Sequence, residues 1–302
     1  MHALNAMDTV YDRLLVDAVD LHCHIDYEFS ATLFRKAMPE WEWLPRAEQA
    51  GMRAVVLKSH LWPTAAVLPF VDQVYPGAVR VVGSITLNPL CGGLDPWAVE
   101  AAAHLGARAV FMPTWGSRND HDRGGFGRRL AAAFDHFDGA RLGVLTVLDD
   151  EGQLLPQARE VLRLAQQLDL MLSTGHLAPQ EALALAEEAH QLGFEKLMFG
   201  HPLSGSVGAS AELVKQAASL GAWIEFCWPT VAPGRHHPAE VVGLVKEVGA
   251  SRVILTSDFF GGSNPSPSDL LRIFLGALFD AGMTESEIRA AVSDNPAQLI
   301  GL

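Results

Sequence analysis

Short runs of apolar residues alternate with longer amphipathic segments along almost the whole chain. Most of these runs are continuous stretches of Val, Ile, Leu and Phe rather than strict apolar–polar alternations, which is typical of parallel strands covered by helices. Eight such runs predict strands at Val16–Cys23, Ala54–Lys58, Arg80–Leu87, Ala107–Met112, Leu170–Thr174, Lys196–Gly200, Ala222–Cys227 and Arg252–Ser257.

The amphipathic segments between the runs predict helices. The clearest ones span Leu154–Leu168, Pro179–Leu192, Ala211–Leu220, Pro238–Val248 and Pro267–Ala281. Proline is tolerated in the first turn of a helix because it gives up no intrahelical hydrogen bond there, so Pro179 and Pro238 mark helix starts. Strand–helix alternation over 302 residues predicts an α/β protein with a (β/α)8 TIM barrel, and a doubly wound open sheet is the second arrangement compatible with it.

The chain shows no break in composition and no linker rich in proline or serine, so we expect one domain over residues 1–302. The segment Gly143–Pro156 predicts a small hairpin, with a tight turn near Asp150-Glu151-Gly152, inserted before the fifth strand.

The first predicted strand ends in His22-Cys23-His24. Side chains alternate between the two faces of a strand, so His22 and His24 share a face and Cys23 points to the opposite one. Two imidazoles on one face can bind a divalent metal ion. The motif alone is a weak signal, because a pair of core histidines bonded to the backbone has the same pattern.

Polar residues also end other predicted strands. They are Lys58 and His60 after the second strand, His176 after the fifth, His201 after the sixth and Asp258 after the eighth. A polar ring at the end of a buried strand is costly without a partner, and a shared metal ion would supply one. In a barrel of this kind the chemistry lies at these strand ends.

This order of residues resembles the amidohydrolase superfamily of metal-dependent barrel enzymes. That family has His-x-His on strand one, a histidine on each of strands five and six, and an aspartate on strand eight. The corresponding residues here are His22, His24, His176, His201 and Asp258. The last residues, Asn295-Pro296-Ala297 followed by Gly301, also resemble the Asn-Pro-Ala-x-x-x-Gly ending common in the family.

The resemblance implies that His22, His24, His176 and Asp258 bind a metal ion. It also implies that Asp258 accepts a proton from the attacking water, and that His201 binds a second metal or polarises the substrate carbonyl. Zn²⁺ is the expected metal, and Mn²⁺ or Fe²⁺ would also suit mixed imidazole and carboxylate ligands.

One departure from the family pattern leaves the number of metal ions open. Binuclear members usually carry a carboxylated lysine or a glutamate on strand four, but the run Val110-Phe111-Met112-Pro113-Thr114 has neither. Lys58 on the second strand is the strand-end lysine available. It would either be carboxylated and bridge two ions, or remain an ammonium that binds a substrate carboxylate or oxyanion.

The implied activity is metal-dependent hydrolysis of an amide, cyclic amide, lactone or ester bond in a small molecule. One alternative is non-oxidative decarboxylation of an aromatic or enoic carboxylic acid on the same barrel. Another is a metal-binding barrel without turnover. Aromatic and polar side chains after the strand ends predict a substrate-binding wall, consisting of His60, Trp62, Trp115, Trp228 and Phe259. Glu225 on the seventh strand could either support the site or form an ordinary salt bridge.

The amino-acid composition agrees with this interpretation and adds few constraints to it. The chain is 49% hydrophobic and 19% charged, which suits a globular protein with a large core. Its net charge of −13 argues against nucleic acid or an anionic membrane as the main partner. Three cysteines make a disulfide framework improbable, and no apolar stretch approaches about 18 residues, so we expect a cytoplasmic protein. Whether copies associate into a homo-oligomer stays open.

Overall fold

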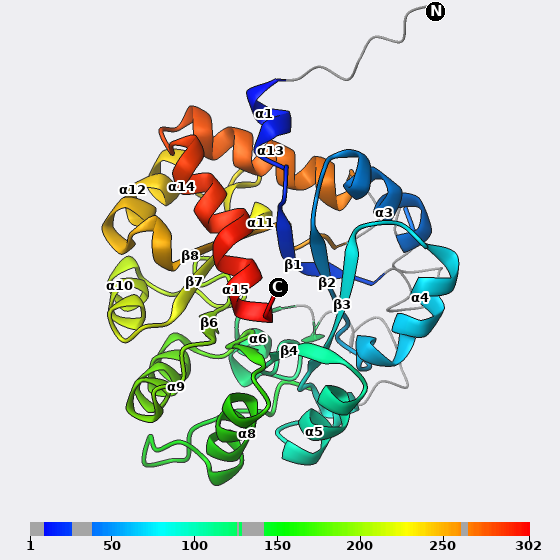
Figure 1. Cartoon of the computed structure of the whole chain (residues 1–302). Helices are drawn as coiled ribbons and strands as arrows, with labels where there is room; N and C mark the ends of the chain where they lie inside the picture. Colours follow the sequence, from blue (N-terminus) through cyan, green and yellow to red (C-terminus); the bar gives the residue numbers. More distant parts are fainter. Residues whose placement is uncertain (1–8, 26–37, 126, 129–141, 261–264) are drawn as a thin grey trace, which may run out of the picture.

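Eight parallel strands form one sheet in which each strand pairs with the next along the chain. In the computed structural model, which describes residues 9–25, 38–125, 127–128, 142–260 and 265–302, they are β1 (Val19–His24), β2 (Ala54–Lys58), β3 (Arg80–Thr86), β4 (Ala107–Phe111), β5 (Met171–Ser173), β6 (Leu197–Phe199), β7 (Trp223–Cys227) and β8 (Val253–Thr256). A parallel bridge between Cys23 and Phe259 joins β1 to the segment after β8, and the His24 N–H donates to the Phe259 carbonyl at 3.0 Å. The barrel is therefore nearly closed (Figure 1), and the predicted (β/α)8 fold is confirmed.

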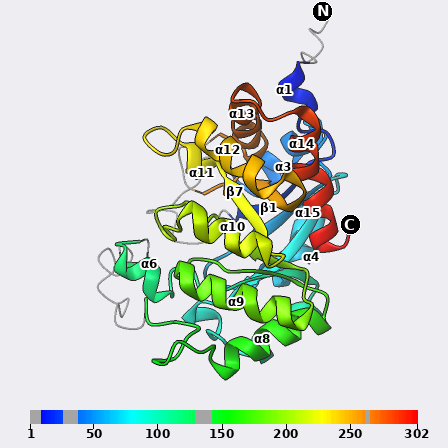
Figure 2. The same ribbon diagram turned by 90° about the vertical axis from the view of Figure 1, so that its left-hand side faces the viewer.

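Helices surround this sheet. They are α1 (Val10–Arg13), α3 (Glu40–Gln49), α4 (Leu68–Val74), α5 (Pro96–His104), α6 (Arg118–Asp122), α8 (Pro156–Gln167), α9 (Pro179–Leu192), α10 (Ala211–Ser219), α11 (Trp228–Val231), α12 (Pro238–Val248), α13 (Pro267–Asp280), α14 (Glu285–Arg289) and α15 (Asn295–Ile300). Figure 2 shows α8, α9 and α10 side by side on the outside of the barrel. Both α9 and α12 begin at the proline that predicted their start. None of the described helices is long and apolar enough to span a membrane.

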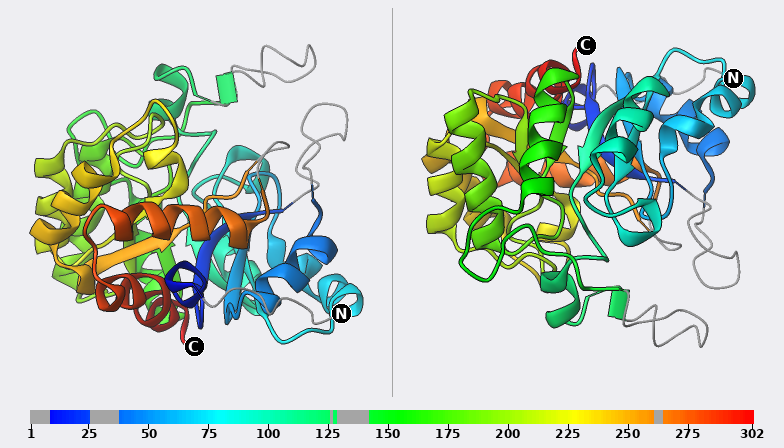
Figure 3. Two further views of the ribbon diagram at one scale, coloured as in Figure 1. Left: turned by 90° about the horizontal axis from the view of Figure 1, so that it is seen from above. Right: turned by 90° about the horizontal axis from the view of Figure 1, so that it is seen from below.

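The inside of the barrel is apolar at one end and polar at the other. Inward-facing residues of the strands form a buried cluster that includes Val19, Val56, Met198 and Ile254. Helix α15 covers this end, since Ala297, Leu299 and Ile300 belong to the same cluster. Figures 2 and 3 show α15 and α6 at opposite ends of the barrel.

The Asn-Pro-Ala ending has a structural role at the covered end. The Asn295 side-chain amide donates to the carbonyls of Ala250 and Val253, at 2.9 and 2.8 Å. These bonds attach α15 to the start of β8, and Gly301 ends the helix in the left-handed conformation that glycine permits.

Strand β1 carries one extra residue, which sets the direction of its side chains. Asp20 pairs with Val55, but Cys23 pairs with Leu57, so three steps along β1 correspond to two along β2. Such a bulge changes the face of the strand from which the following side chains project. Leu21 lies in the apolar interior cluster, whereas His22 and His24 lie in the polar end and Cys23 packs among the outer core residues.

The predicted insertion before β5 is present as a short turn. An antiparallel bridge joins Leu148 to Leu154, and the Asp149 N–H donates to the Gln153 carbonyl at 2.9 Å.

Candidate metal centre

The ends of β1 and β8 bring two histidines and one carboxylate together. The Nε2 atoms of His22 and His24 lie 3.1 and 3.3 Å from Oδ1 of Asp258. One ligand atom from each of these three residues lies within 4.8 Å of the other two. The mixture of imidazole and carboxylate donors suits a divalent transition metal.

The protonation of His22 favours metal binding. Nδ1 of His22 lies 2.9 Å from Oε1 of Glu225, and because a carboxylate accepts, Nδ1 carries the proton. Burial lowers the pKa of His22 to about 3, against the opposing attraction of Asp258, so the ring is neutral near pH 7. Nε2 of His22 then carries a lone pair that faces the negative Asp258 carboxylate. These two groups repel each other unless a cation lies between or beside them. A neutral imidazole nitrogen and a carboxylate are both ligands that a divalent ion prefers, so the residues present fit such an ion.

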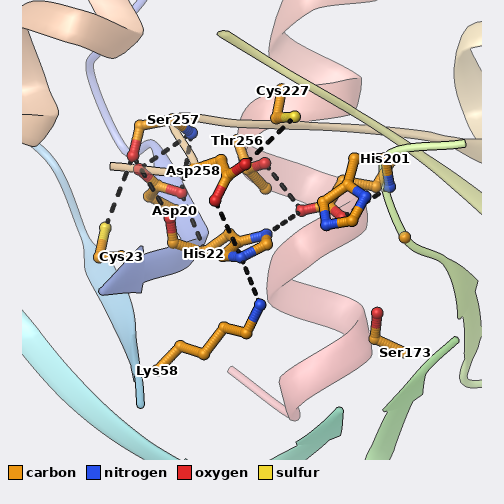
Figure 4. A network of polar contacts seen from close by, with 12 residues as sticks. Asp20, His22, Cys23, Lys58, Ser173, His201, Cys227, Thr256, Ser257 and Asp258 are labelled. Carbon is orange, nitrogen blue, oxygen red and sulfur yellow. Dashed lines mark hydrogen bonds and ion pairs between the residues drawn. The ribbon is translucent and has the colours of Figure 1, made fainter. Parts of the chain in front are cut away.

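Lys58 supplies a cation at this point. Its Nζ lies 2.8 Å from Nε2 of His22 and 4.7 Å from the centre of the Phe111 ring, and the side chain is buried. Figure 4 shows Lys58 pointing at His22 with Asp258 beside it. Both predicted roles of Lys58, as a carboxylated bridge or as an ammonium that binds the substrate, stay predictions.

Glu225 connects several strands beneath the site. It is fully buried on β7; its Oε1 also accepts from the Thr256 hydroxyl at 2.8 Å, and its Oε2 accepts from the His201 backbone N–H at 3.0 Å. Hydrogen bonds of this kind orient metal-ligating histidines. The sequence left two interpretations of Glu225, support of the site or an ordinary salt bridge. These contacts favour support of the site.

Asp120 is a site residue that the sequence analysis missed. It lies on α6, its side chain is fully buried, and its Oδ1 lies 2.8 Å from Nδ1 of His176. Burial alone would raise the pKa of Asp120, but the hydrogen bond and the charge of His176 outweigh it and hold that pKa below its ordinary value. No signal in the short polar segment Arg118–Asp122 distinguishes this carboxylate from its solvated neighbours.

His201 lies between two other histidines. Its ring centre is 4.9 Å from that of His176 and 5.6 Å from that of His22, and its Nδ1 lies 3.2 Å from the Ser204 hydroxyl. Burial, reinforced by the charge of His176, lowers the pKa of His201 well below its ordinary value. One ligand atom from each of His22, His201 and Glu225 also lies within 4.8 Å of the other two.

The backbone is strained at two of the strand-end residues. His201 and Asp258 have φ values of +25° and +45°, in the left-handed region that non-glycine residues rarely adopt. Such conformations persist only where the surroundings enforce them, and they cluster at functional sites.

A cavity of about 1040 Å³ opens over these residues. Three members of the predicted wall line it, namely His60, Trp115 and Trp228. The His60 and Trp115 rings stack with centres 3.7 Å apart, and Nδ1 of His60 bonds the Thr114 hydroxyl at 2.8 Å.

Two members of the predicted wall lie elsewhere. Trp62 is half-buried outside the cavity lining. Phe259 is fully buried with its ring centre 6.4 Å from that of Trp43, so its assignment to the substrate wall is corrected. Its backbone pairs with Cys23 of β1, which directs the side chain outward into the core, and Phe260 lines the cavity instead.

Comparison with known families gives one match. A model described as "Family of unknown function (DUF6282)" matches residues 17–225. No curated protein is significantly similar to the chain in sequence.

Solved structures of the amidohydrolase superfamily share the fold. An amidohydrolase from Pseudomonas aeruginosa superimposes with a TM-score of 0.60 at 12% identity, covering 97% of this chain and 99% of that one. The dipeptidase AC, a metallopeptidase, gives 0.62 at 13% identity over 95% and 100% of the two chains. A 2,6-dihydroxybenzoate decarboxylase in complex with 2,6-dihydroxybenzoate gives 0.59 at 13% identity over 94% and 98%. At these identities the likeness concerns the fold.

Proposed function

This chain belongs to the DUF6282 family, whose function is unknown, and we propose that it is a metal-dependent hydrolase that cleaves an amide, cyclic amide, lactone or ester bond of a small molecule. The observation that carries the proposal is the convergence of His22, His24 and Asp258, with Nδ1 of His22 held by Glu225. The hydrolases among the structures of the same fold support the reaction class.

His22, His24 and Asp258 would hold the metal, with His176 and His201 as further imidazole donors, and Zn²⁺ is our preferred ion. When bound, such an ion lowers the pKa of water toward neutrality and polarises a carbonyl. Asp258 would take a proton from the nucleophile and return it to the leaving group. His201 and Lys58 would stabilise negative charge that develops on the substrate oxygen.

Glu225 and Asp120 act through the histidines they contact. Each carboxylate accepts a hydrogen bond from Nδ1 of its histidine, which keeps the proton on Nδ1. The lone pair of Nε2 is then free to bind a metal ion. The thiol of Cys227 takes no part as a nucleophile, because burial and the charge of Asp258 raise its pKa well above its ordinary value.

The test is a screen of the zinc- or manganese-loaded protein against small esters, lactones, amides and cyclic amides, with products detected by mass spectrometry. Asp258→Asn should lower kcat by about 10²–10⁴-fold with a smaller change in KM, the range expected for loss of a general base. Asp72→Asn, at an exposed position on α4, is the matched control and should be unaffected. Hydrolysis that is equally fast in both variants would refute the role of Asp258.

Decarboxylation is the second candidate, and one observation favours it. Lys58 places a buried cation beside His22, where it could bind a carboxylate, and a decarboxylase shares the fold. Incubation with aromatic and enoic carboxylic acids, with CO₂ measured, separates the two reactions. Release of CO₂ with no hydrolysis product from any ester or amide would replace the hydrolase proposal.

A further inference from the structure

Two arginine side chains converge on one glycine in the cavity lining. Nε of Arg123, just after α6, donates to the Gly205 carbonyl at 2.6 Å. Nη1 of Arg235, in the loop after α11, lies 3.8 Å from the position that a Cβ on Gly205 would occupy. Both arginines line the cavity above the candidate metal centre.

The position of Arg123 depends on a second glycine. Gly208 has φ +71°, and a Cβ there would come within 2.2 Å of Nη2 of Arg123. The absence of a side chain at Gly208 lets the guanidinium lie directly against the loop. Arg123 is exposed, but its hydrogen bond to Gly205 restrains the side chain. Less side-chain entropy is therefore lost when it binds a ligand.

Neither guanidinium has a carboxylate partner among the residues that the structure describes. The cavity lining contains two carboxylates, Asp258 at the candidate metal centre and Glu240, whose Oε2 lies 3.1 Å from Nδ1 of His236. In a chain with a net charge of −13, two cations gathered at one point repel each other and attract an anion.

Aromatic rings form another part of the cavity lining. The stacked rings of His60 and Trp115 are nearly perpendicular to the Phe260 ring, and their centres lie 6.0 and 6.4 Å from its centre. Such a surface favours a flat ring in offset-stacked or edge-to-face contact.

We propose that Arg123 and Arg235 form an anion-binding site for a carboxylate or phosphate substituent of a small cyclic substrate, whose ring packs against Trp115 and Phe260. The proposal rests on the proposed function only in taking this cavity as the substrate site. A guanidinium presents its N–H groups in a fork that matches either anion.

The test is calorimetric binding to the zinc-loaded protein, which requires no turnover. The probes are benzene-1,3-dicarboxylate, 3-carboxyphenyl phosphate and 3-carbamoylbenzoate, in which an uncharged amide replaces one anionic group. We expect at least one of the two dianions to bind at least about 10-fold more tightly than the amide, because hydrogen bonds to charged groups are stronger than those to neutral groups. Whichever dianion is preferred then identifies the substituent as carboxylate or phosphate.

The Arg123→Met, Arg235→Met double variant should lose this preference, because the second anionic group of a dianion then has no guanidinium to bind. Gly208→Ala should reduce the preference as well, because the added Cβ displaces the Arg123 guanidinium. The control is Arg108→Met, Arg163→Met, which removes the same charge from exposed positions outside the cavity lining.

Equal binding of all three probes by the parent protein, or an undiminished preference in the double variant, would overturn the proposal. A protein that prefers the dianions but hydrolyses none of the screened compounds would refute the proposed function and leave this site intact.

Discussion

At the scale of single residues, the site depends on the partners of its histidines as much as on the histidines. Nδ1 of His22 faces Glu225, and Nδ1 of His176 faces Asp120; both carboxylates are buried. A histidine offers a definite lone pair only when its other nitrogen is committed to a hydrogen bond. These two carboxylates therefore determine which nitrogen of each ring can bind a metal.

The Glu225→Gln variant tests this. Glutamine keeps the shape of the side chain but removes the charge. Its amide nitrogen replaces one of the two oxygens and cannot accept the bonds made there, either those from His22 and Thr256 or the one from His201. We expect affinity for Zn²⁺ to fall by about 10–100-fold, measured by competition with a chromogenic chelator. Glu187→Gln, at an exposed position of α9, is the control. Unchanged affinity in Glu225→Gln would show that the buried carboxylate is merely structural.

At the scale of elements, helix α14 shows how one carboxylate joins two segments. Glu287 accepts from the Thr284 N–H and hydroxyl, both at 2.8 Å, in a capping box. It also accepts two bonds of 2.6 Å from Lys246 of α12. The bond from Lys246 and the backbone bond from Thr284 lower the pKa of Glu287 from its ordinary value of 4.5 to about 2.

Glu287→Gln should therefore destabilise the protein by about 1 kcal/mol at pH 7, the usual contribution of a helix cap. The pKa is depressed in the folded state, so this stability is present above about pH 4.5 and is lost as pH falls toward 2. Urea unfolding at several pH values should show the parent and the variant converging in acid. Glu160→Gln on α8 is an exposed control. A stability difference that did not change with pH would contradict the ionic contribution.

At the scale of the whole molecule, one end of the barrel is closed by apolar residues and the other carries the candidate metal centre. Apolar strand starts and α15 close one end, and the polar strand ends at the other gather side chains from β1, β2, β7 and β8. A metal ion bound by β1 and β8 would join the first and last strands, where the sheet is bridged by Cys23 and Phe259.

Removal of the metal should therefore lower thermal stability as well as activity. An ion at 100 times its Kd stabilises the folded state by about 2.7 kcal/mol. We expect chelator treatment to lower Tm, zinc to restore it, and His22→Ala, His24→Ala to show no response to either. His104→Ala, His190→Ala, with two exposed histidines changed, should respond as the parent does. Elemental analysis should find at least one ion per parent chain, and no bound metal after reconstitution would contradict the metal site.

Much of the fold follows from local pattern. The strands and the five predicted helices lie within about three residues of their expected bounds, because continuous apolar runs and first-turn prolines act over a few neighbouring residues. The largest shift is at β1, which begins at Val19 rather than Val16. Asp17 there adopts φ +61°, which prevents an earlier start of the strand.

The sequence by itself determined which strands end in ligand-type residues and, through the period of two, that His22 and His24 share a face. It could not pair residues that are remote in the chain. Only the tertiary structure decided that Glu225 and Asp120 hold the histidines, that Phe260 rather than Phe259 lines the cavity, and that Arg123 and Arg235 meet at Gly205. The physical reason is that periodicity sets direction along one strand, whereas distances between strands and loops depend on bulges, left-handed residues and the closure of the barrel.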